Sequence, residues 1–587
     1  MPQPTQKLEL TWIGKGDEPK LEPRILIEQP EFSYGDPNSG NMLIHGDNLL
    51  ALKALEQDFA GKVKCIYIDP PYNTGSAFEH YDDFKEHSIW LDFMRQRLSN
   101  LKSLLREDGF ICCHIDDSEG HYLKVLMDEV FGRINYLTTF YVRVRYPDKT
   151  LKQDMSFHKE IEYIHIYRKS PLARPNLKKI ALSFDKYVFR IVELKEGEIT
   201  NLGGKKVEVF KRGDYRIEKD SSGSETGLKE IWATGSILDG NSSGRFFRDY
   251  LQSRKEIDGL GVLYKVYGIG DDTFNYRYFT GPQRESATKG KYFQGVPKDK
   301  VNAEGLDMET PINNFYDLAA NFGNCRHEGG VEFRSGKKPE ALLKLILDCF
   351  SDQDDWILDS FMGSGTTGAV AHKMNRRWIG IELGEQAISH VYPRLVRVVS
   401  NADPSGVSSE VSWMGGGGFK FYSLAPSLLN QDSLGNWVIS DQYNPTMLAA
   451  AMAKQEGFRY EPDERLFWKQ GRSSEKDFIY TTTQFVTVEL LDRIHDDMQE
   501  DESLLICCKA FHKTAGSKYG NITIKKIPSM LLGRCEFGRE DYSLNIVNMP
   551  TDPDAEPWAG PEIQETAAPK KKTRKKGDAE EQPSLFE

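Results

Sequence analysis

Four consecutive residues, Asp69-Pro70-Pro71-Tyr72, place a carboxylate, two prolines and an aromatic ring directly after the apolar run of residues 63–68. Open α/β sheets bind ligands at the carboxyl ends of their strands, and adjacent prolines stiffen a turn. Such a turn suits chemistry on an exocyclic amino group of a base. The Asp69 carboxylate and the Pro70 carbonyl would each accept one amino hydrogen, and the Tyr72 ring would stack on the base, which must then be flipped out of a duplex.

A second turn, rich in glycine, follows the apolar run of residues 356–359 and contains Gly363 and Gly365. Glycines let the backbone approach a nucleotide closely, and Glu382, at the end of the next predicted strand, is placed to bind a ribose. This pattern alone is equally typical of a tight connection, and both NAD and S-adenosylmethionine carry an adenosine ribose. No lysine follows the glycines, which argues against a phosphate-binding P-loop.

Alternating strands and helices must position both turns. Apolar runs at residues 41–46, 63–68, 109–116, 356–361 and 377–382 alternate with helical patterns, which predicts a parallel sheet covered on both faces. Residues 170–310 interrupt this alternation with Gly, Ser, Asp and Lys. The fold class we expect is therefore α/β: a doubly wound, Rossmann-like sheet with an inserted target recognition region and a smaller C-terminal α+β domain.

The chain of 587 residues is long enough for several domains. We expect an N-terminal extension (1–30), a catalytic half (31–170), a target recognition region (171–310), a cofactor-binding half (311–428), a C-terminal partner or dimerisation domain (429–550) and a disordered tail (551–587).

Composition predicts a cytoplasmic protein, since we find neither a membrane-spanning apolar run nor a signal-peptide pattern. The eight cysteines and twelve histidines form no metal-binding spacing, so we expect no metal site. The formal net charge of −12 implies that any phosphate contacts come from a local basic surface.

In motif and order, the two turns resemble the β-class amino-methyltransferases of bacterial DNA modification, and the segments HGDNLLAL and IDDSEGHYLKVLMDEVFG are similar to modification subunits of type III restriction systems. The resemblance spans roughly residues 30–425. It implies S-adenosylmethionine as the cofactor and N6 of adenine as the methyl acceptor. It also implies catalytic roles for Asp69, Pro70, Pro71 and Tyr72, and cofactor contacts from Asp359, Phe361, Gly363, Gly365, Thr366, Glu382, Lys337 and Pro339.

Basic and aromatic residues are interleaved around and within the inserted region, as expected for phosphate clamps and for wedges beside a flipped base. The predicted DNA contacts are Arg143, Arg145, Arg245, Arg248, Arg277 and Lys291. An ordinary solvated surface explains any single cluster equally well.

Partners follow from the same resemblance: double-stranded DNA, a second copy of the chain and a restriction helicase-nuclease subunit. The segment Gln582-Pro583-Ser584-Leu585-Phe586 is similar to peptides that dock on bacterial sliding clamps. Three other functions remain open: methylation of cytosine N4, a nicotinamide-dependent oxidoreductase, and a DNA-binding subunit without catalysis.

Overall fold

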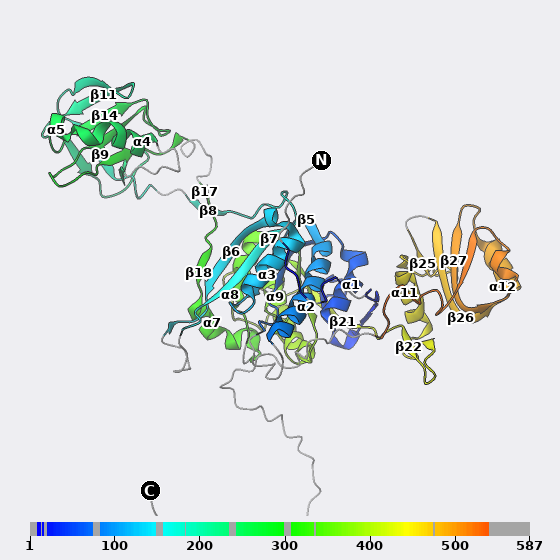
Figure 1. The fold of residues 1–587 in the computed structure, drawn as a ribbon. Coiled ribbons are helices and arrows are strands. Elements are labelled where there is room, and N and C mark those ends of the chain that lie inside the picture. Colours follow the sequence, from blue (N-terminus) through cyan, green and yellow to red (C-terminus); the bar gives the residue numbers. More distant parts are fainter. Residues whose placement is uncertain are drawn as a thin grey trace, which may run out of the picture.

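The computed structural model describes residues 9–12, 14–16, 20–73, 83–147, 157–181, 184–233, 242–298, 307–333, 336–473 and 476–538. A large central sheet organises them, with two smaller β-rich regions on either side of it (Figure 1). From edge to edge, the main sheet contains β1 (Leu26–Glu28), β21 (Gly418–Leu424), β3 (Met42–His45), β20 (Arg377–Glu382), β19 (Trp356–Asp359), β4 (Val63–Ile68), β5 (Leu105–Ile115), β7 (Ile161–Arg168), β6 (Tyr136–Arg143) and β18 (Phe315–Asp317), and β2 (Tyr34–Gly35) pairs with β21.

The central strands β21, β3, β20, β19, β4 and β5 are parallel, as expected. Strand β7 differs, because it runs antiparallel to both β5 and β6. The sheet is therefore mixed, in the doubly wound α/β class that the alternation of strands and helices predicts.

Helices cover both faces of this sheet. One layer contains α1 (Asn48–Phe59), α2 (Asp83–Leu104) and α3 (Gly120–Met127), and the other contains α8 (Glu340–Phe350), α9 (Thr366–Lys373) and α10 (Tyr392–Val399). Successive side chains of a strand point to opposite faces. In β4, Cys65 and Tyr67 accordingly pack in the core beneath α8 to α10, whereas Ile66 and Ile68 pack beneath α1 to α3.

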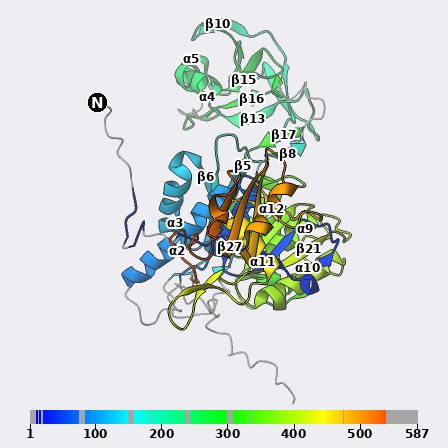
Figure 2. The same ribbon diagram turned by 90° about the vertical axis from the view of Figure 1, so that its right-hand side faces the viewer.

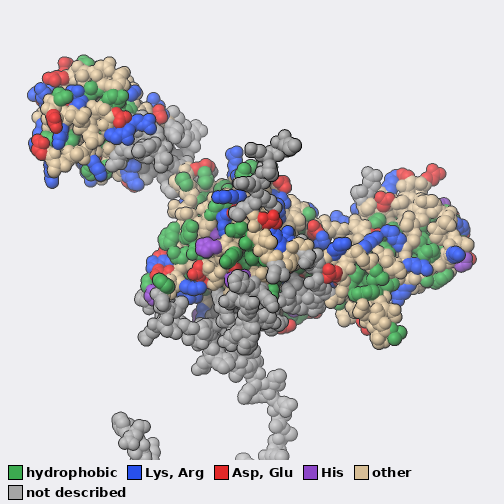
Figure 3. All heavy atoms as spheres, viewed as in Figure 1, with side chains coloured by type: hydrophobic (Ala, Val, Ile, Leu, Met, Phe, Trp, Pro, Cys, Tyr) green, Lys and Arg blue, Asp and Glu red, His purple; other side chains and the backbone are tan. Residues whose placement is uncertain are grey.

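The inserted region forms a separate lobe. A two-stranded ribbon, β8 (Lys178–Ala181) paired with β17 (Asp307–Thr310), carries the chain out to this lobe and back (Figure 1). The lobe contains a six-stranded sheet of β10 (Glu198–Leu202), β11 (Lys205–Phe210), β14 (Leu263–Tyr267), β15 (Tyr276–Thr280), β16 (Lys291–Gln294) and β13 (Lys229–Trp232), a ribbon of β9 (Phe189–Glu193) and β12 (Tyr215–Lys219), and the short helices α4 (Ser242–Phe246) and α5 (Lys255–Asp258). Figure 2 shows this lobe above the main sheet. On the face in Figure 3, basic and acidic side chains of the lobe are mixed.

The C-terminal region is a second β-rich unit. Its five-stranded sheet contains β24 (Arg459–Tyr460), β25 (Gly471–Arg472), β26 (Asp477–Val486), β27 (Ser503–Phe511) and β28 (Ile522–Lys526), accompanied by β22 (Leu429–Gln431), β23 (Trp437–Ile439), α11 (Pro445–Gln455) and α12 (Val488–Asp497).

The segment predicted as an N-terminal extension belongs partly to the core. Strand β1 pairs with β21 at the edge of the main sheet, and the buried Glu22 carboxylate accepts hydrogen bonds from Ser427 and from the Leu428 amide. A boundary at residue 30 therefore cuts through packed structure. Strand β1 cannot be predicted from a periodic pattern, because three residues are too few to show one.

Three further features of the described residues concern membrane spans, metal ligands and cysteines. None of their helices is long and apolar enough to cross a lipid bilayer. No group of three or more His, Cys, Asp and Glu side chains among them is placed to hold a metal ion. All eight cysteines are free thiols, and seven are buried.

Candidate active site

The turn after β4 is fixed by contacts to three of its residues. The Asp69 carboxylate accepts a hydrogen bond from the Tyr72 hydroxyl through Oδ1 (2.8 Å). Its Oδ2 forms an ion pair with the Lys338 ammonium group (2.9 Å). The Trp90 indole on α2 donates to the carbonyl of Pro71 at 2.8 Å. Of the two proline carbonyls, that of Pro70 is therefore the one to consider as an acceptor for a ligand.

A chain of polar groups lies behind this turn. Glu162, on β7, accepts from the Tyr72 hydroxyl at 3.1 Å, and its Oε2 lies 2.8 Å from Nε2 of His114. Burial acts to raise the pKa of the Glu162 carboxyl, but Lys338, His114 and Tyr72 together lower that pKa well below its usual range. Glu162 is consequently ionised at neutral pH.

The glycine turn after β19 has the backbone that its sequence predicts. Gly363 and Gly365 have φ angles of 52° and 78°, in the left-handed region that favours glycine. A β-carbon on Gly365 would lie 2.9 Å from the Val391 side chain, so close packing also selects glycine there. The turn therefore exposes its backbone to any ligand above the sheet edge.

Two carboxylates flank the glycine turn. Burial raises the pKa of Asp359 to about 7, although hydrogen bonds from Thr367 and from the Phe361 amide lower it. Glu382, at the end of β20, accepts from the Gly363 amide at 2.6 Å, and burial raises its pKa as well. Both carboxylates are thus held beside the turn by its own backbone.

One buried polar atom at the turn has no partner among the described residues, the hydroxyl of Ser360. Buried polar groups are normally hydrogen-bonded, so an orphaned one beside two buried carboxylates indicates a place for a polar ligand. Hydroxyl groups of a ribose would supply donors and acceptors to such a site.

The structure brings the two turns together. Strands β4 and β19 are parallel neighbours, with Ile66 opposite Leu358. Asp69 and the glycine turn therefore lie side by side at the carboxyl ends of these strands. Lys338 connects them: its carbonyl accepts from the Thr366 hydroxyl at 3.1 Å, and its ammonium group pairs with Asp69. A ligand on the glycine turn would therefore face Asp69.

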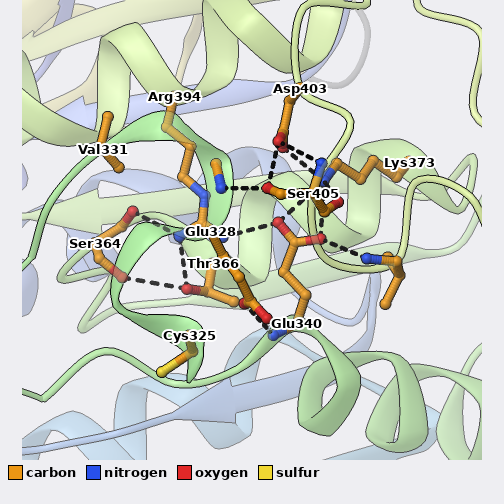
Figure 4. Close-up of polar contacts among 12 residues, drawn as sticks. Cys325, Glu328, Val331, Glu340, Ser364, Thr366, Lys373, Arg394, Asp403 and Ser405 are labelled. Atoms are coloured by element: carbon orange, nitrogen blue, oxygen red, sulfur yellow. Dashed lines mark hydrogen bonds and ion pairs between the residues drawn. The ribbon is translucent and has the colours of Figure 1, made fainter. Parts of the chain in front are cut away.

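Behind the glycine turn lies a fully buried ionic network (Figure 4). The Arg394 guanidinium donates to the Ser364 carbonyl (3.1 Å) and the Thr366 hydroxyl (2.7 Å), and pairs with Glu340 (2.9 Å). Glu340 in turn pairs with Lys373 (2.8 Å), which also contacts Asp403 (2.7 Å). Two cations and two anions balance, and together they tie α8, α9 and α10 to the turn.

The remaining predicted cofactor residues lie in the segment before α8. Lys337 donates to the carbonyls of Arg326, Glu328 and Val331, and burial lowers its pKa to about 8. Pro339 is buried immediately before α8. Sequence reasoning selected these two residues of the Gly336-to-Pro339 segment and passed over Lys338, whose contact with Asp69 only the fold creates.

The residues missed by the sequence analysis are Lys338, Glu162, His114 and Arg394. They are distant in sequence from both motifs and reach the site only through sheet order and helix packing. An ionisable residue in an otherwise apolar run, such as His114 within residues 110–115 of β5, is the one signal that could have indicated them.

The predicted DNA contacts near the main sheet lie at the end of β6. Arg143 pairs with Glu160 at 2.7 Å and with Asp317 at 3.4 Å. Arg145 is exposed. Neither residue has a geometry that distinguishes a DNA contact from a solvated surface.

In the lobe, Arg245 and Arg248 are exposed, and Arg248 pairs with Asp249 at 2.8 Å. Lys291 pairs with Glu230 at 2.8 Å and lies over the exposed Trp232 ring. These side chains remain available for DNA contacts.

Arg277 has a different environment and corrects one prediction. It is buried, and its guanidinium donates to Asp272 at 2.9 and 3.0 Å and to the Ser243 hydroxyl. A buried, fully engaged arginine stabilises the lobe and does not reach a phosphate. The alternating Tyr-Arg-Tyr-Phe pattern suggested exposure, but residue 277 points into the lobe.

One cavity of about 870 Å³ lies away from both turns. It is lined by residues near the amino ends of the parallel strands, such as Met42 and Trp356, and by Lys454 of α11. The residues of the two turns do not line this cavity, so the candidate active site lies at the other, carboxyl ends of the strands.

Comparisons with known proteins match the segments that form both turns. A family model described as DNA methylase (N6_N4_Mtase) matches residues 63–392, which include both turns. The Mod subunit of the type III restriction-modification enzyme EcoP15I of Escherichia coli is 32% identical over 497 residues, covering 73% of this chain and 72% of that protein. A probable type III Mod subunit, HindVI of Haemophilus influenzae, is 32% identical over 426 residues, covering 68% of this chain.

The chain spans 56% of the length of that Haemophilus relative and of a Salmonella typhimurium Mod subunit, so the overlap is partial. A solved structure, PvuII DNA methyltransferase (cytosine-N4-specific), aligns with 64% of this chain and 91% of its own at 13% identity and a TM-score of 0.32. The family assignment depends on the sequence match across both turns, and by that match the chain belongs to the N6/N4 DNA methylase family.

Proposed function

We propose that the protein transfers a methyl group from S-adenosylmethionine to N6 of an adenine flipped out of duplex DNA. The observation that carries the proposal is the meeting of the Asp69 turn and the glycine turn on neighbouring strands. When bound, S-adenosylmethionine supplies an electrophilic methyl group. The other requirements, orientation of the amino group and a cradle for the cofactor, are met by residues of this chain.

At the catalytic turn, the chain acts on the amino group through two acceptors. The Asp69 carboxylate accepts one amino hydrogen and the Pro70 carbonyl the other, which directs the nitrogen lone pair toward the cofactor side. The Tyr72 ring stacks on the flipped base. The stiffness of Pro70-Pro71 and the anchoring of the Pro71 carbonyl by Trp90 keep these groups in place.

At the cofactor side, the residues fit an adenosine with a charged amino-acid end. Glu382 and the orphaned Ser360 hydroxyl are suited to ribose hydroxyls. The cofactor contacts we propose are Asp359, Phe361, Gly363, Gly365, Thr366 and Glu382, with Lys337 and Pro339 flanking the methionine portion.

The test combines binding and product identity. Calorimetry should detect binding of S-adenosylmethionine to the protein and no binding of NAD. Tritiated methyl groups should enter unmethylated plasmid DNA, and base analysis should find N6-methyladenine. Recovery of N4-methylcytosine would reassign the acceptor within the same site, and NAD binding without methyl transfer would overturn the proposal.

The partners of this reaction are part of the proposal. The lobe would contact double-stranded DNA through Arg245, Arg248 and Lys291, together with Arg143 and Arg145 at the sheet edge. We also propose a homodimer and association with a restriction helicase-nuclease subunit, since Mod subunits are relatives of this chain. The peptide Gln582 to Phe586, proposed to bind a sliding clamp, lies outside the described residues. Light scattering and pull-down with each partner test these interactions.

A further inference from the structure

Both oxygens of the Asp69 carboxylate already accept donors from the chain itself. The Tyr72 hydroxyl donates to Oδ1 at 2.8 Å, and the Lys338 ammonium lies 2.9 Å from Oδ2. Under the proposed function, the same carboxylate must accept an amino hydrogen of the base. The carboxylate has about four lone-pair sites, so sites remain open, but the two internal donors compete with the substrate for its negative charge.

A second acceptor lies within reach of both competing donors. Oε2 of Glu162 is 3.1 Å from the Tyr72 hydroxyl oxygen and 3.7 Å from Nζ of Lys338. A tyrosine hydroxyl has a single hydrogen, so it can donate to Asp69 or to Glu162 but not fully to both. Rotation of this hydrogen about the Cζ–O bond, without movement of heavy atoms, changes the acceptor.

Glu162 is held rigidly enough to serve as that acceptor. Its Oε2 lies 2.8 Å from Nε2 of His114, whose other ring nitrogen, Nδ1, is 2.7 Å from the Tyr67 hydroxyl. His114 and Tyr67 are completely buried on β5 and β4. The carboxylate is also kept ionised, since its neighbours lower its pKa.

We propose that Glu162 is a positioning residue that receives the Tyr72 hydroxyl hydrogen, and shares the Lys338 ammonium group, when a base binds to Asp69. Asp69 then becomes a stronger acceptor for the amino group, while Tyr72 and Lys338 remain hydrogen-bonded. In the absence of DNA, the same donors return to Asp69 and keep its charge compensated. This inference rests on the proposed methyltransferase function.

The test is the rate of methyl transfer in a single turnover, with enzyme in excess over DNA. Glu162→Gln keeps the shape of the side chain but replaces a charged acceptor with a weaker neutral one. We expect the rate to fall about tenfold, with the Kd for S-adenosylmethionine unchanged. The Tm should fall, because the ionised carboxylate that pairs with Lys338 and His114 is lost. In a Tyr72→Phe background, the hydroxyl that competes for Asp69 is absent. Glu162→Gln should then lower the single-turnover rate by about threefold or less.

A matched control is Asp128, which directly follows α3 and contacts the other end of β7. Asp128 likewise accepts from a tyrosine hydroxyl, that of Tyr167 (2.7 Å), and pairs with a lysine, Lys124 (2.8 Å). Asp128→Asn should leave the transfer rate within twofold of the original. If Glu162→Gln does not fold, Glu162→Asp, which withdraws the oxygen from Tyr72 but keeps the charge, takes its place with the same expectations.

Equal fold losses in the two Tyr72 backgrounds would overturn the inference, because Glu162 would then act independently of the hydroxyl. An unchanged rate, or a loss matched by weaker cofactor binding, would overturn it too. The absence of methyl transfer by the unsubstituted protein would instead reject the proposed function, so the two failures are distinguishable.

Discussion

The two turns at the sheet edge are held in different ways. The Asp69 turn depends on donors that lie beside the reacting groups and have a choice of acceptors. The glycine turn is fixed from behind by a network of Arg394, Glu340, Lys373 and Asp403 that is closed to solvent. The glycine turn, which would bind the cofactor, is thus held in one conformation. The Asp69 turn, which would bind the base, has hydrogen-bond donors that can change their acceptors.

This difference matches the tasks that we assign to the two turns. A cofactor cradle benefits from a fixed backbone, because any ordering on binding would weaken affinity. A catalytic carboxylate must exchange its partners when the substrate arrives. Substitutions at the two turns should therefore separate cleanly into losses of rate and losses of binding.

The largest expected effect is at Asp69. Asp69→Ala removes the acceptor that orients the amino group, and we expect the single-turnover rate to fall by about a thousandfold or more. The Kd for S-adenosylmethionine should change by less than about threefold, since the glycine turn has its own support. Asp108→Ala, at the opposite end of the strands, is the control and should keep the rate. A comparable loss of cofactor affinity in Asp69→Ala would break the distinction between the turns.

Substitution of Arg394, behind the glycine turn, should weaken cofactor binding, in contrast to substitution of Asp69, which should lower the transfer rate. Arg394→Met leaves Glu340 without one of its two cations in a fully buried place, which costs about 3–5 kcal/mol of folding free energy. Arg394→Lys keeps a charge but cannot donate to Ser364, Thr366 and Glu340 with the same geometry. We expect a lowered Tm and an S-adenosylmethionine Kd raised about tenfold for Arg394→Lys, measured by calorimetry.

A lower Tm with unchanged cofactor affinity would mean that the network stabilises the fold without shaping the turn. A matched comparison is Arg376→Lys, a half-buried arginine near Ser351, which should lower the Tm slightly and leave cofactor binding intact.

The sequence predicted the two turns but not what holds them. Periodicity and proline and glycine positions identify β4, β19 and their turns, because those signals are local. Partners such as Glu162 and Arg394 come from β7 and α10, and no local pattern predicts that these elements meet the turns. The antiparallel direction of β7 could not be predicted either, since the residue types of a strand do not indicate its orientation.

The pH dependence of stability tests whether Asp359, beside the glycine turn, is protonated in the folded protein. Because burial raises its pKa to about 7, the folded protein keeps this carboxyl protonated over a range in which the unfolded chain has lost the proton. Its contribution to stability is therefore greatest below about pH 4 and declines as the pH rises to 7. Between pH 5 and pH 8, the unfolding free energy of the unsubstituted protein should fall by about 2.5 kcal/mol relative to Asp359→Asn.

Denaturant titrations without cofactor at several pH values measure this difference. Asp354→Asn, on the exposed loop before β19, should show the same pH dependence as the unsubstituted protein. A pH-independent difference for Asp359→Asn would mean that the carboxyl is ionised in the folded state, and that the glycine turn carries a negative charge at neutral pH.

The smallest effects should come from the lobe, outside both turns. Arg245→Ala and Arg248→Ala each remove one exposed guanidinium, and we expect a severalfold weaker DNA affinity with a salt dependence reduced by about one unit of slope. Arg190→Ala, which removes an exposed lobe arginine paired with Glu218, serves as the control. At saturating DNA, the single-turnover rate and the cofactor Kd should stay unchanged, because neither turn depends on these side chains. A change in rate at saturating DNA would mean that the lobe also positions the flipped base, and the acceptor side of the site would then extend beyond the Asp69 turn.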